Sequence, residues 1–182
     1  MRFYEALGLE PKLTLDSEEL KKRFYDRSRQ WHPDRFGRAP AADQQRALEM
    51  TSVLNDAFRT LRDPVSRAEY FLSQSGIQIS KEAPPELLEE VFELNMALEE
   101  LRGGEESARP QLVAADQRFR ATLGQIDGAL VELFERHDQG APVLEEIRAA
   151  LNRRRYVANL VREVEKELVV VKPEVLAADE HR

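Results

Sequence analysis

The sequence predicts an all-α protein, and three observations lead to that fold class. Apolar side chains recur every three or four residues along most of the 182 residues, which is the period of amphipathic helices. Charged residues make up 34% of the chain, which holds only 8 glycines and 9 prolines, a balance typical of helical proteins. No segment of any length shows the strict alternation expected of a strand.

The first two expected helices have clear local boundary signals. The first is short, covers residues 2–7, and is closed by Gly8. Asp16 is expected to cap the second helix, and Glu19, three residues later, completes the pattern of a capping box. Pro33 ends this helix, because its ring cannot continue the hydrogen-bond pattern.

Two further helices complete the N-terminal part, residues 1–74. The third is expected over residues 42–62, and its main stripe is made of Leu48, Thr51, Leu54, Phe58 and Leu61. The fourth begins at Asp63-Pro64, since Asp is a favoured N-cap and Pro is favoured in the first turn.

The helical period lapses over residues 75–84, which contain Gly76 and the start of a proline pair, so this segment is predicted to be a linker. Three longer helices are expected after it, over residues 85–101, 110–137 and 143–172. Their short connections favour an antiparallel three-helix bundle over residues 85–172. The polar residues 173–182 are expected to form a flexible tail.

Charge and composition exclude several classes of protein. The first 74 residues hold 13 Lys and Arg against 12 Asp and Glu, whereas the remainder holds 14 against 22. An acidic chain is a poor general binder of nucleic acid, because phosphate contacts need an excess of Lys and Arg. The chain has no cysteine, which excludes disulfides, thiolate metal sites and a cysteine nucleophile, so no metal and no cofactor are expected.

No segment reaches the roughly 18 apolar residues of a membrane span. The first residues are too short in apolar length, and too quickly acidic, for a signal peptide. We therefore expect a soluble cytoplasmic protein that does not bind membranes.

The tripeptide His32-Pro33-Asp34 stands between the second and third helices. The proline stiffens the turn, so the histidine and the aspartate project from a fixed backbone. Basic residues precede and follow the tripeptide in the sequence, at Lys21, Lys22, Arg23, Arg27, Arg29 and Arg35. Such a helix face steers a domain toward an acidic partner. No nucleophile or phosphate-binding loop lies nearby, so no catalytic residue is expected. A solvated turn and a solvated basic face are the plain alternatives.

Residues 1–73 resemble a J-domain, the module that activates the ATPase of DnaK-type 70-kDa chaperones. The matching pieces are Phe3-Tyr4-Glu5-Ala6-Leu7-Gly8-Leu9, the basic helix, His32-Pro33-Asp34, and Asp63-Pro64 with Arg67 and Tyr70. The resemblance implies an antiparallel helical hairpin with short flanking helices. It also implies a co-chaperone rather than an enzyme, in which the His-Pro-Asp loop and the basic helix dock on the chaperone and favour ATP hydrolysis.

The C-terminal part indicates which class of J-domain protein the chain resembles. No Gly/Phe-rich linker and no Cys-x-x-Cys repeat follows the J-domain-like segment, in contrast to general-purpose DnaJ proteins. Residues 67–76 and 85–100 instead resemble the HscB-type co-chaperones of iron–sulfur cluster biogenesis. That resemblance implies that the bundle binds an IscU-type scaffold and presents it to an HscA-type or DnaK-type chaperone. The cysteine pairs of some eukaryotic relatives are missing, which favours a bacterial form.

The helix expected over residues 85–101 has two apolar faces. The first face is a line of apolar residues that is enough to bury the helix in a bundle. It consists of Leu87, Val91, Leu94, Leu98 and Leu101. A second face carries Leu88, Phe92 and Met96 beside Glu93, and we predict that these four residues bind the scaffold. The alternative is that the second face packs against the J-domain. Glu89 stands where typical HscB sequences have Met, so the binding set departs from the family pattern.

Two other functions fit the same residues. One is a J-domain co-chaperone that serves a different client. The other is a non-catalytic helical adaptor with a degenerate J-domain, although the intact His-Pro-Asp tripeptide argues against it.

Overall fold

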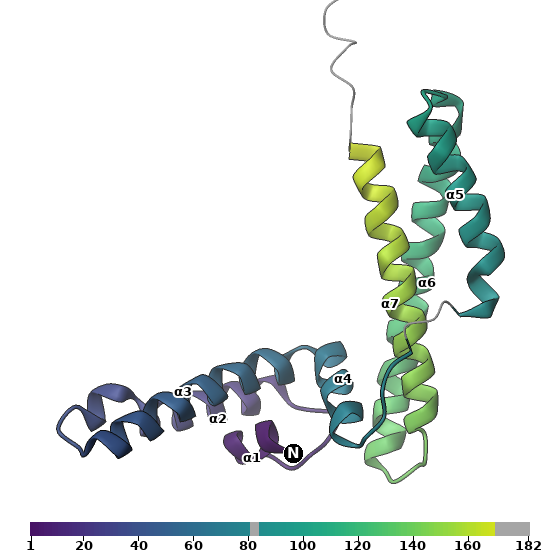
Figure 1. The fold of residues 1–182 in the computed structure, drawn as a ribbon. Coiled ribbons are helices and arrows are strands. Elements are labelled where there is room, and N and C mark those ends of the chain that lie inside the picture. Colours follow the sequence, from purple (N-terminus) through teal and green to yellow (C-terminus); the bar gives the residue numbers. More distant parts are fainter. Residues whose placement is uncertain (81–83, 170–182) are drawn as a thin grey trace, which may run out of the picture. The chain divides into compact units, whose positions relative to one another are not determined.

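The computed structural model describes residues 1–80 and 84–169, and all regular structure within them is helical, as predicted (Figure 1). The contacts divide the chain into two compact units. One unit holds residues 1–79 and 130–151, and the other holds residues 80–129 and 152–182. The two long C-terminal helices contribute to both units. The predicted boundaries at residues 74, 84 and 172 stay predictions, and part of the linker and the whole tail lie outside the described residues.

The first unit contains the predicted J-domain helices. They are α1 (Arg2–Leu7), α2 (Ser17–Trp31), the 3-10 turn η1 (Pro33–Phe36), α3 (Ala41–Arg62) and α4 (Pro64–Gln74). Figure 1 shows α2 and α3 side by side as a hairpin, with α1 and α4 beside it. The core of these helices is apolar and includes Tyr4, Leu7, Leu20, Leu54, Leu61 and Leu72.

The helix ends follow their local chemistry. Gly8 closes α1 at a φ of 67°, the left-handed conformation that glycine adopts without steric cost. The Asp16 carboxylate accepts the Glu19 N–H at 2.7 Å, so the predicted cap of α2 is confirmed. The capping box is only half formed, because the Glu19 carboxylate accepts from Arg23 Nε at 2.6 Å instead.

The apolar stripe predicted for α3 is wrong at Leu48. This side chain is 53% exposed, and the neighbouring Ala47 is fully buried in its place. The buried line continues through Leu54, Ala57 and Leu61. Alanine at two of these positions allows the neighbouring helices to approach α3 closely, which the larger leucine would prevent.

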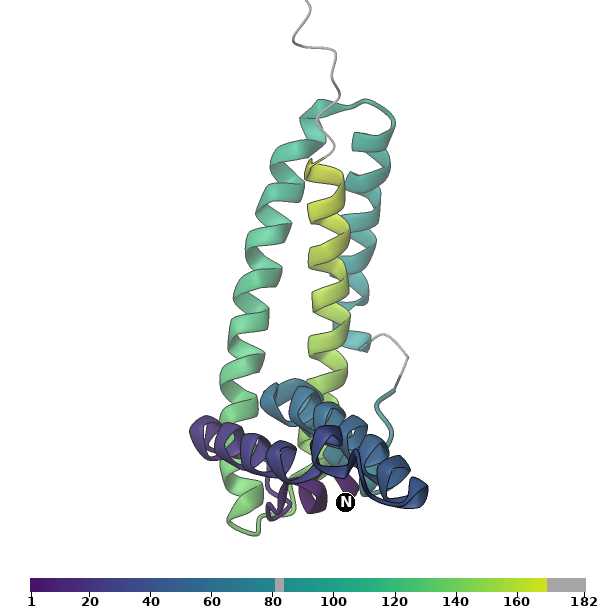
Figure 2. The same ribbon diagram turned by 90° about the vertical axis from the view of Figure 1, so that its left-hand side faces the viewer.

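The second unit is built from η2 (Pro85–Leu87), α5 (Leu88–Arg102), η3 (Glu106–Ala108) and parts of α6 (Arg109–Asp138) and α7 (Leu144–Val169). Both views show α5, α6 and α7 alongside one another (Figure 2). The helix predicted from residue 85 begins with one 3-10 turn, so its α-helical part starts three residues later.

Ion pairs link the helices of this unit around its apolar core. Arg102 on α5 pairs with Glu167 on α7 at 2.7 Å, and Arg120 on α6 pairs with Glu165 on α7. The core itself consists of leucines and other large apolar residues, among them Leu94, Leu98, Leu112, Phe119, Leu160 and Val164. Burial of these side chains supplies most of the stability, since exposed ion pairs contribute at most about 1 kcal/mol each.

Candidate protein-interaction surfaces

The His-Pro-Asp tripeptide forms a short, rigid corner between α2 and α3. His32 ends α2 with extended backbone angles, and Pro33 starts the 3-10 turn η1. The Asp34 N–H donates to His32 Nδ1 at 3.3 Å, and the Arg35 N–H donates to the His32 carbonyl at 3.0 Å. The backbone of the tripeptide is therefore held by its own hydrogen bonds.

Both functional side chains of this corner are accessible. The side chain of His32 is 58% exposed, and that of Asp34 is 90% exposed. Because His32 Nδ1 accepts the amide hydrogen, the neutral imidazole carries its proton on Nε2, which is free to donate to a partner. The Asp34 carboxylate lies 3.6 Å from Nδ1 and keeps its capacity to accept hydrogen bonds.

Neighbouring side chains support the corner from both sides. The rings of Trp31 and Phe36 stack with centroids 5.9 Å apart. The Thr51 hydroxyl on α3 donates to the Trp31 carbonyl at 3.2 Å, and the Arg35 guanidinium donates to the Arg29 carbonyl at 3.3 Å. These contacts fix the corner to both long helices of the hairpin.

The basic face of α2 is less positive than the residue count predicts. Lys21 pairs with Glu18 at 2.7 Å, Arg23 pairs with Glu19 at 2.6 Å, and a third pair joins Arg29 to Asp26. The hydrogen bond that Lys21 donates to the Glu18 carboxylate raises the pKa of Lys21 above its ordinary value. These pairs lie one helical turn apart on an exposed surface, where they are weak, so a stronger acidic partner can compete for the cations.

Three members of the predicted docking set have no such partner. Within the described residues, no ion pair is formed by Lys22, Arg27 or Arg35. Lys22 is exposed, whereas Arg27 is half-buried, and its guanidinium passes so close to Gly8 that a Cβ there would lie 2.9 Å from it. Gly8 therefore gives α1 its left-handed end and also leaves room for Arg27.

Arg67 on α4 is the buried polar residue of the first unit. Only 6% exposed, it donates from Nε to the Leu13 carbonyl at 2.8 Å and from a terminal nitrogen to the Leu61 carbonyl at 2.6 Å. Burial lowers the pKa of its guanidinium, and the nearby Tyr4, Asp63 and Asp138 oppose that effect. Arg67 thus joins α4, the α1–α2 loop and the end of α3.

Asp138, at the end of α6, binds the same α1–α2 loop. This contact was not predicted from the sequence. Its carboxylate accepts the Leu13 N–H at 3.0 Å, the Thr14 N–H at 2.7 Å and the Thr14 hydroxyl. The adjacent His137 ring packs edge-to-face on Phe71, with centroids 4.9 Å apart. Residues 130–151 therefore belong to the same compact unit as the J-domain helices.

The Asp138 hydrogen bonds predict a measurable pH dependence of stability. Burial alone would raise the pKa of this carboxyl, but the bonds from Thr14 and Leu13 hold it below its ordinary value. A lowered folded-state pKa stabilises the fold above the ordinary Asp pKa of about 3.9, and this contribution disappears as the pH falls through the folded value.

We therefore expect Asp138→Asn to lower the free energy of unfolding by about 1–3 kcal/mol at pH 7. Urea unfolding of both proteins between pH 7 and pH 2.5 measures the difference. The difference should begin to shrink as the pH falls below the ordinary Asp pKa of about 3.9, and should be lost as the pH passes through the lower pKa of the folded protein. A difference that is constant across this range would contradict the assignment.

The two faces predicted for α5 differ in burial as expected. Leu87, Leu94 and Leu98 are at most 3% exposed. Leu88, Phe92 and Met96 are 55%, 67% and 48% exposed. Glu93 is also exposed. The role of this second face in binding stays a prediction, but its accessibility fits a partner-binding surface.

Membrane-spanning helices and metal sites were considered for the part of the chain that the structure describes. None of their helices is both long and apolar enough to cross a membrane. Nor does any group of three or more histidine and carboxylate side chains come close enough together, in residues 1–80 and 84–169, to hold a metal ion.

Comparison with known families supports a two-part chain. Residues 2–70 match the DnaJ domain, and residues 83–165 match the HSCB C-terminal oligomerisation domain. The co-chaperone protein HscB homologue of Vibrio vulnificus is 38% identical over 122 residues, covering 65% of this chain and 71% of that protein. The homologue of Vibrio cholerae is 32% identical over 176 residues, covering 91% and 96%.

Two solved structures of HscB proteins are also similar to this chain. The chaperone HscB from Vibrio cholerae has a TM-score of 0.64 and 30% identity, and the match covers 91% of this chain and 96% of that chain. Human co-chaperone protein HscB, at 22% identity and a TM-score of 0.67 over 94% and 84%, shows the shared fold alone. The protein therefore belongs to the HscB family of J-domain co-chaperones.

Proposed function

We propose that this protein stimulates the ATPase of an HscA-type or DnaK-type 70-kDa chaperone and delivers an IscU-type scaffold to it during iron–sulfur cluster assembly and transfer. The observation that carries the proposal is the pairing of two accessible surfaces in one chain of this family. The exposed His32-Pro33-Asp34 corner is one, and the exposed apolar face of α5 is the other.

The corner and the basic helix would bind the chaperone. Lys21, Lys22, Arg23, Arg27, Arg29 and Arg35 would guide the approach to an acidic surface, which mainly raises the association rate. His32 and Asp34 would then make directional hydrogen bonds from a backbone that Pro33 keeps rigid. No bond is made or broken on this chain, so it acts as an activator and not as an enzyme.

The second unit would hold the scaffold. Leu88, Phe92 and Met96 form an accessible apolar strip on one face of α5, with Glu93 at its edge. Large apolar side chains at the centre of an interface usually contribute most of the binding energy. The cluster is cargo carried by the scaffold, and this chain brings the scaffold and the chaperone together. We infer a bacterial cytoplasmic location for this role.

A substitution at Phe92 tests the scaffold contact. We expect Phe92→Ala to weaken scaffold binding at least tenfold, because a large aromatic anchor of the interface is lost. Isothermal titration calorimetry with a purified IscU-type scaffold measures the affinity.

A matched control is Val131→Ala, because Val131 is also exposed, at 55%, but lies in the other compact unit. It should bind the scaffold with unchanged affinity. An unchanged affinity for Phe92→Ala would contradict the proposed scaffold surface. A pull-down that captures a different client, and no scaffold, would favour the alternative of another J-domain co-chaperone.

A further inference from the structure

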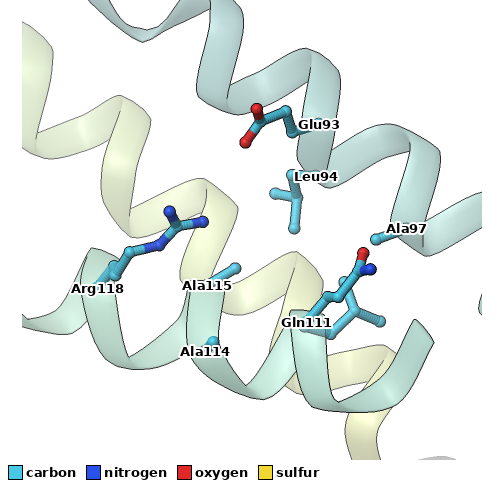
Figure 3. A pocket seen from close by; sticks show the side chains of 8 residues that line it. Glu93, Leu94, Ala97, Gln111, Ala114, Ala115 and Arg118 are labelled. Carbon is cyan, nitrogen blue, oxygen red and sulfur yellow. The ribbon is translucent and has the colours of Figure 1, made fainter. Parts of the chain in front are cut away.

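A groove of about 300 Å³ lies between α5 and α6 in the second unit (Figure 3). The residues that line it include Leu94 and Ala97 on α5, and Ala114 and Ala115 on α6. The groove is open to solvent, and its volume is at the lower end of the range for small-molecule pockets. It therefore suits one inserted side chain of a partner better than an enclosed ligand.

Alanines create the space in this groove. Ala97 and Ala115 are 5% and 4% exposed, so they form a floor of methyl groups, while Ala114 is exposed at the edge. Small residues on facing helices leave a hole into which a larger side chain can insert, as knobs fit into holes between packed helices. No side chain of residues 1–80 and 84–169 fills the hole.

Charges at the mouth indicate the chemistry of the occupant. Figure 3 shows Glu93 from α5 and Arg118 from α6 on the same side of the groove. Neither side chain takes part in an ion pair within residues 1–80 and 84–169. The outer surface of α5 adds the exposed Glu89 and Glu90, which are likewise unpaired in this part of the chain. The local field around the groove is therefore negative, and it attracts a cationic group.

The groove adjoins the apolar strip predicted to bind the scaffold. At 100° per residue, Glu93 and Ala97 lie within about 100° of Met96 around the axis of α5. One partner surface can therefore cover Met96 and reach into the groove at the same time. A partner that rests on the strip would also exclude water from the mouth, which strengthens charge pairing there.

We propose that the groove receives an apolar side chain of the scaffold that is flanked by a Lys or Arg. The apolar group would rest on Ala97 and Ala115, and its basic neighbour would pair with Glu93. Arg118 would donate to a carbonyl or carboxylate oxygen of the same segment. This inference rests on the proposed function, because it extends the scaffold-binding surface from α5 to α6.

Filling the groove tests the inference in the full-length protein. Ala114→Leu and Ala114→Gln each place a larger side chain at the exposed edge, where folding should tolerate it. We expect both to weaken binding of an IscU-type scaffold at least tenfold in titration calorimetry. The matched control is Ala149→Leu, because Ala149 is an exposed alanine of α7 in the other compact unit. Its affinity should equal that of the wild type.

The charge at the mouth gives a second readout. The affinity of the wild type should fall as salt is raised from 50 to about 500 mM, since salt screens exposed charges. The affinity of Glu93→Gln should be lower at 50 mM and should fall less with salt. Equal salt dependence of the two proteins would overturn the assignment of a basic residue to the groove.

The outcomes separate this inference from the proposed function. If Phe92→Ala weakens binding and both Ala114 variants bind like the wild type, the groove is not used, although the scaffold function stands. If the wild type does not bind the scaffold, the proposed function fails and the inference fails with it. Weakened binding of both Ala114 variants, with an unchanged Ala149→Leu control, supports the inference.

Discussion

Replacing His32 by Gln should abolish stimulation of the chaperone ATPase while the protein stays folded. The side chain is 58% exposed, so its loss removes little packing. Glutamine keeps a polar group but cannot reproduce an imidazole whose Nδ1 accepts the Asp34 N–H and whose Nε2 donates outward. We expect stimulation to fall at least tenfold in a steady-state assay with an HscA-type chaperone.

Two controls accompany this experiment. The melting temperature of His32→Gln should lie within a few degrees of the wild-type value, because exposed substitutions change stability by about 0.5 kcal/mol or less. Scaffold binding should also be unchanged, since the predicted scaffold surface lies on α5. Full stimulation by His32→Gln would show that the corner is not the activating element.

Replacing Arg67 by Ala should have the largest effect on stability. The guanidinium is 6% exposed and donates to the carbonyls of Leu13 and Leu61. Its removal leaves two inward-facing carbonyls without this donor and opens a cavity, which together should cost about 3–5 kcal/mol. Urea unfolding at pH 7 measures the loss.

Arg59→Ala is the matched control for this substitution. Arg59 is 75% exposed on α3 and pairs with Asp56 at 2.8 Å. An exposed pair one turn apart on a helix is worth less than about 1 kcal/mol, so the control should unfold almost like the wild type. If Arg67→Ala cost no more than Arg59→Ala, the buried guanidinium would not hold the loop as described.

Local signals predicted most of the fold, because helix ends depend on neighbouring residues. Gly8, the cap at Asp16 and the stop at Pro33 all act within one turn of the chain. The position of Leu48 could not be predicted from neighbouring residues alone. Helical periodicity allows either Leu48 or Ala47 to face inward, and only the close approach of the neighbouring helices selects the smaller residue.

The candidate sites also differ in whether the sequence alone could predict them. The His32 corner was predictable because its tripeptide and its flanking helix are contiguous in sequence. Asp138 was not, since its partners Leu13 and Thr14 lie more than 120 residues earlier. The groove was also missed, because its alanines come from two helices and an alanine in a sequence gives no sign of an unfilled hole.

The charge of the basic helix α2 was also predicted only in part. Counting residues 21–38 gives a strong positive charge, yet Glu18 and Glu19 lie just before that window and pair with Lys21 and Arg23. These pairs arise from the helical spacing of three and four residues. A charge count that begins one turn earlier would have found them.

The proposed function is tested by the ATPase rate of an HscA-type chaperone, measured with this protein, with an IscU-type scaffold, and with both. We expect that this protein alone stimulates the chaperone, and that both together stimulate more than the sum of their separate effects. Phe92→Ala should keep the first effect and lose the second. Absence of stimulation by this protein, or stimulation that the scaffold does not change, would contradict the proposed function.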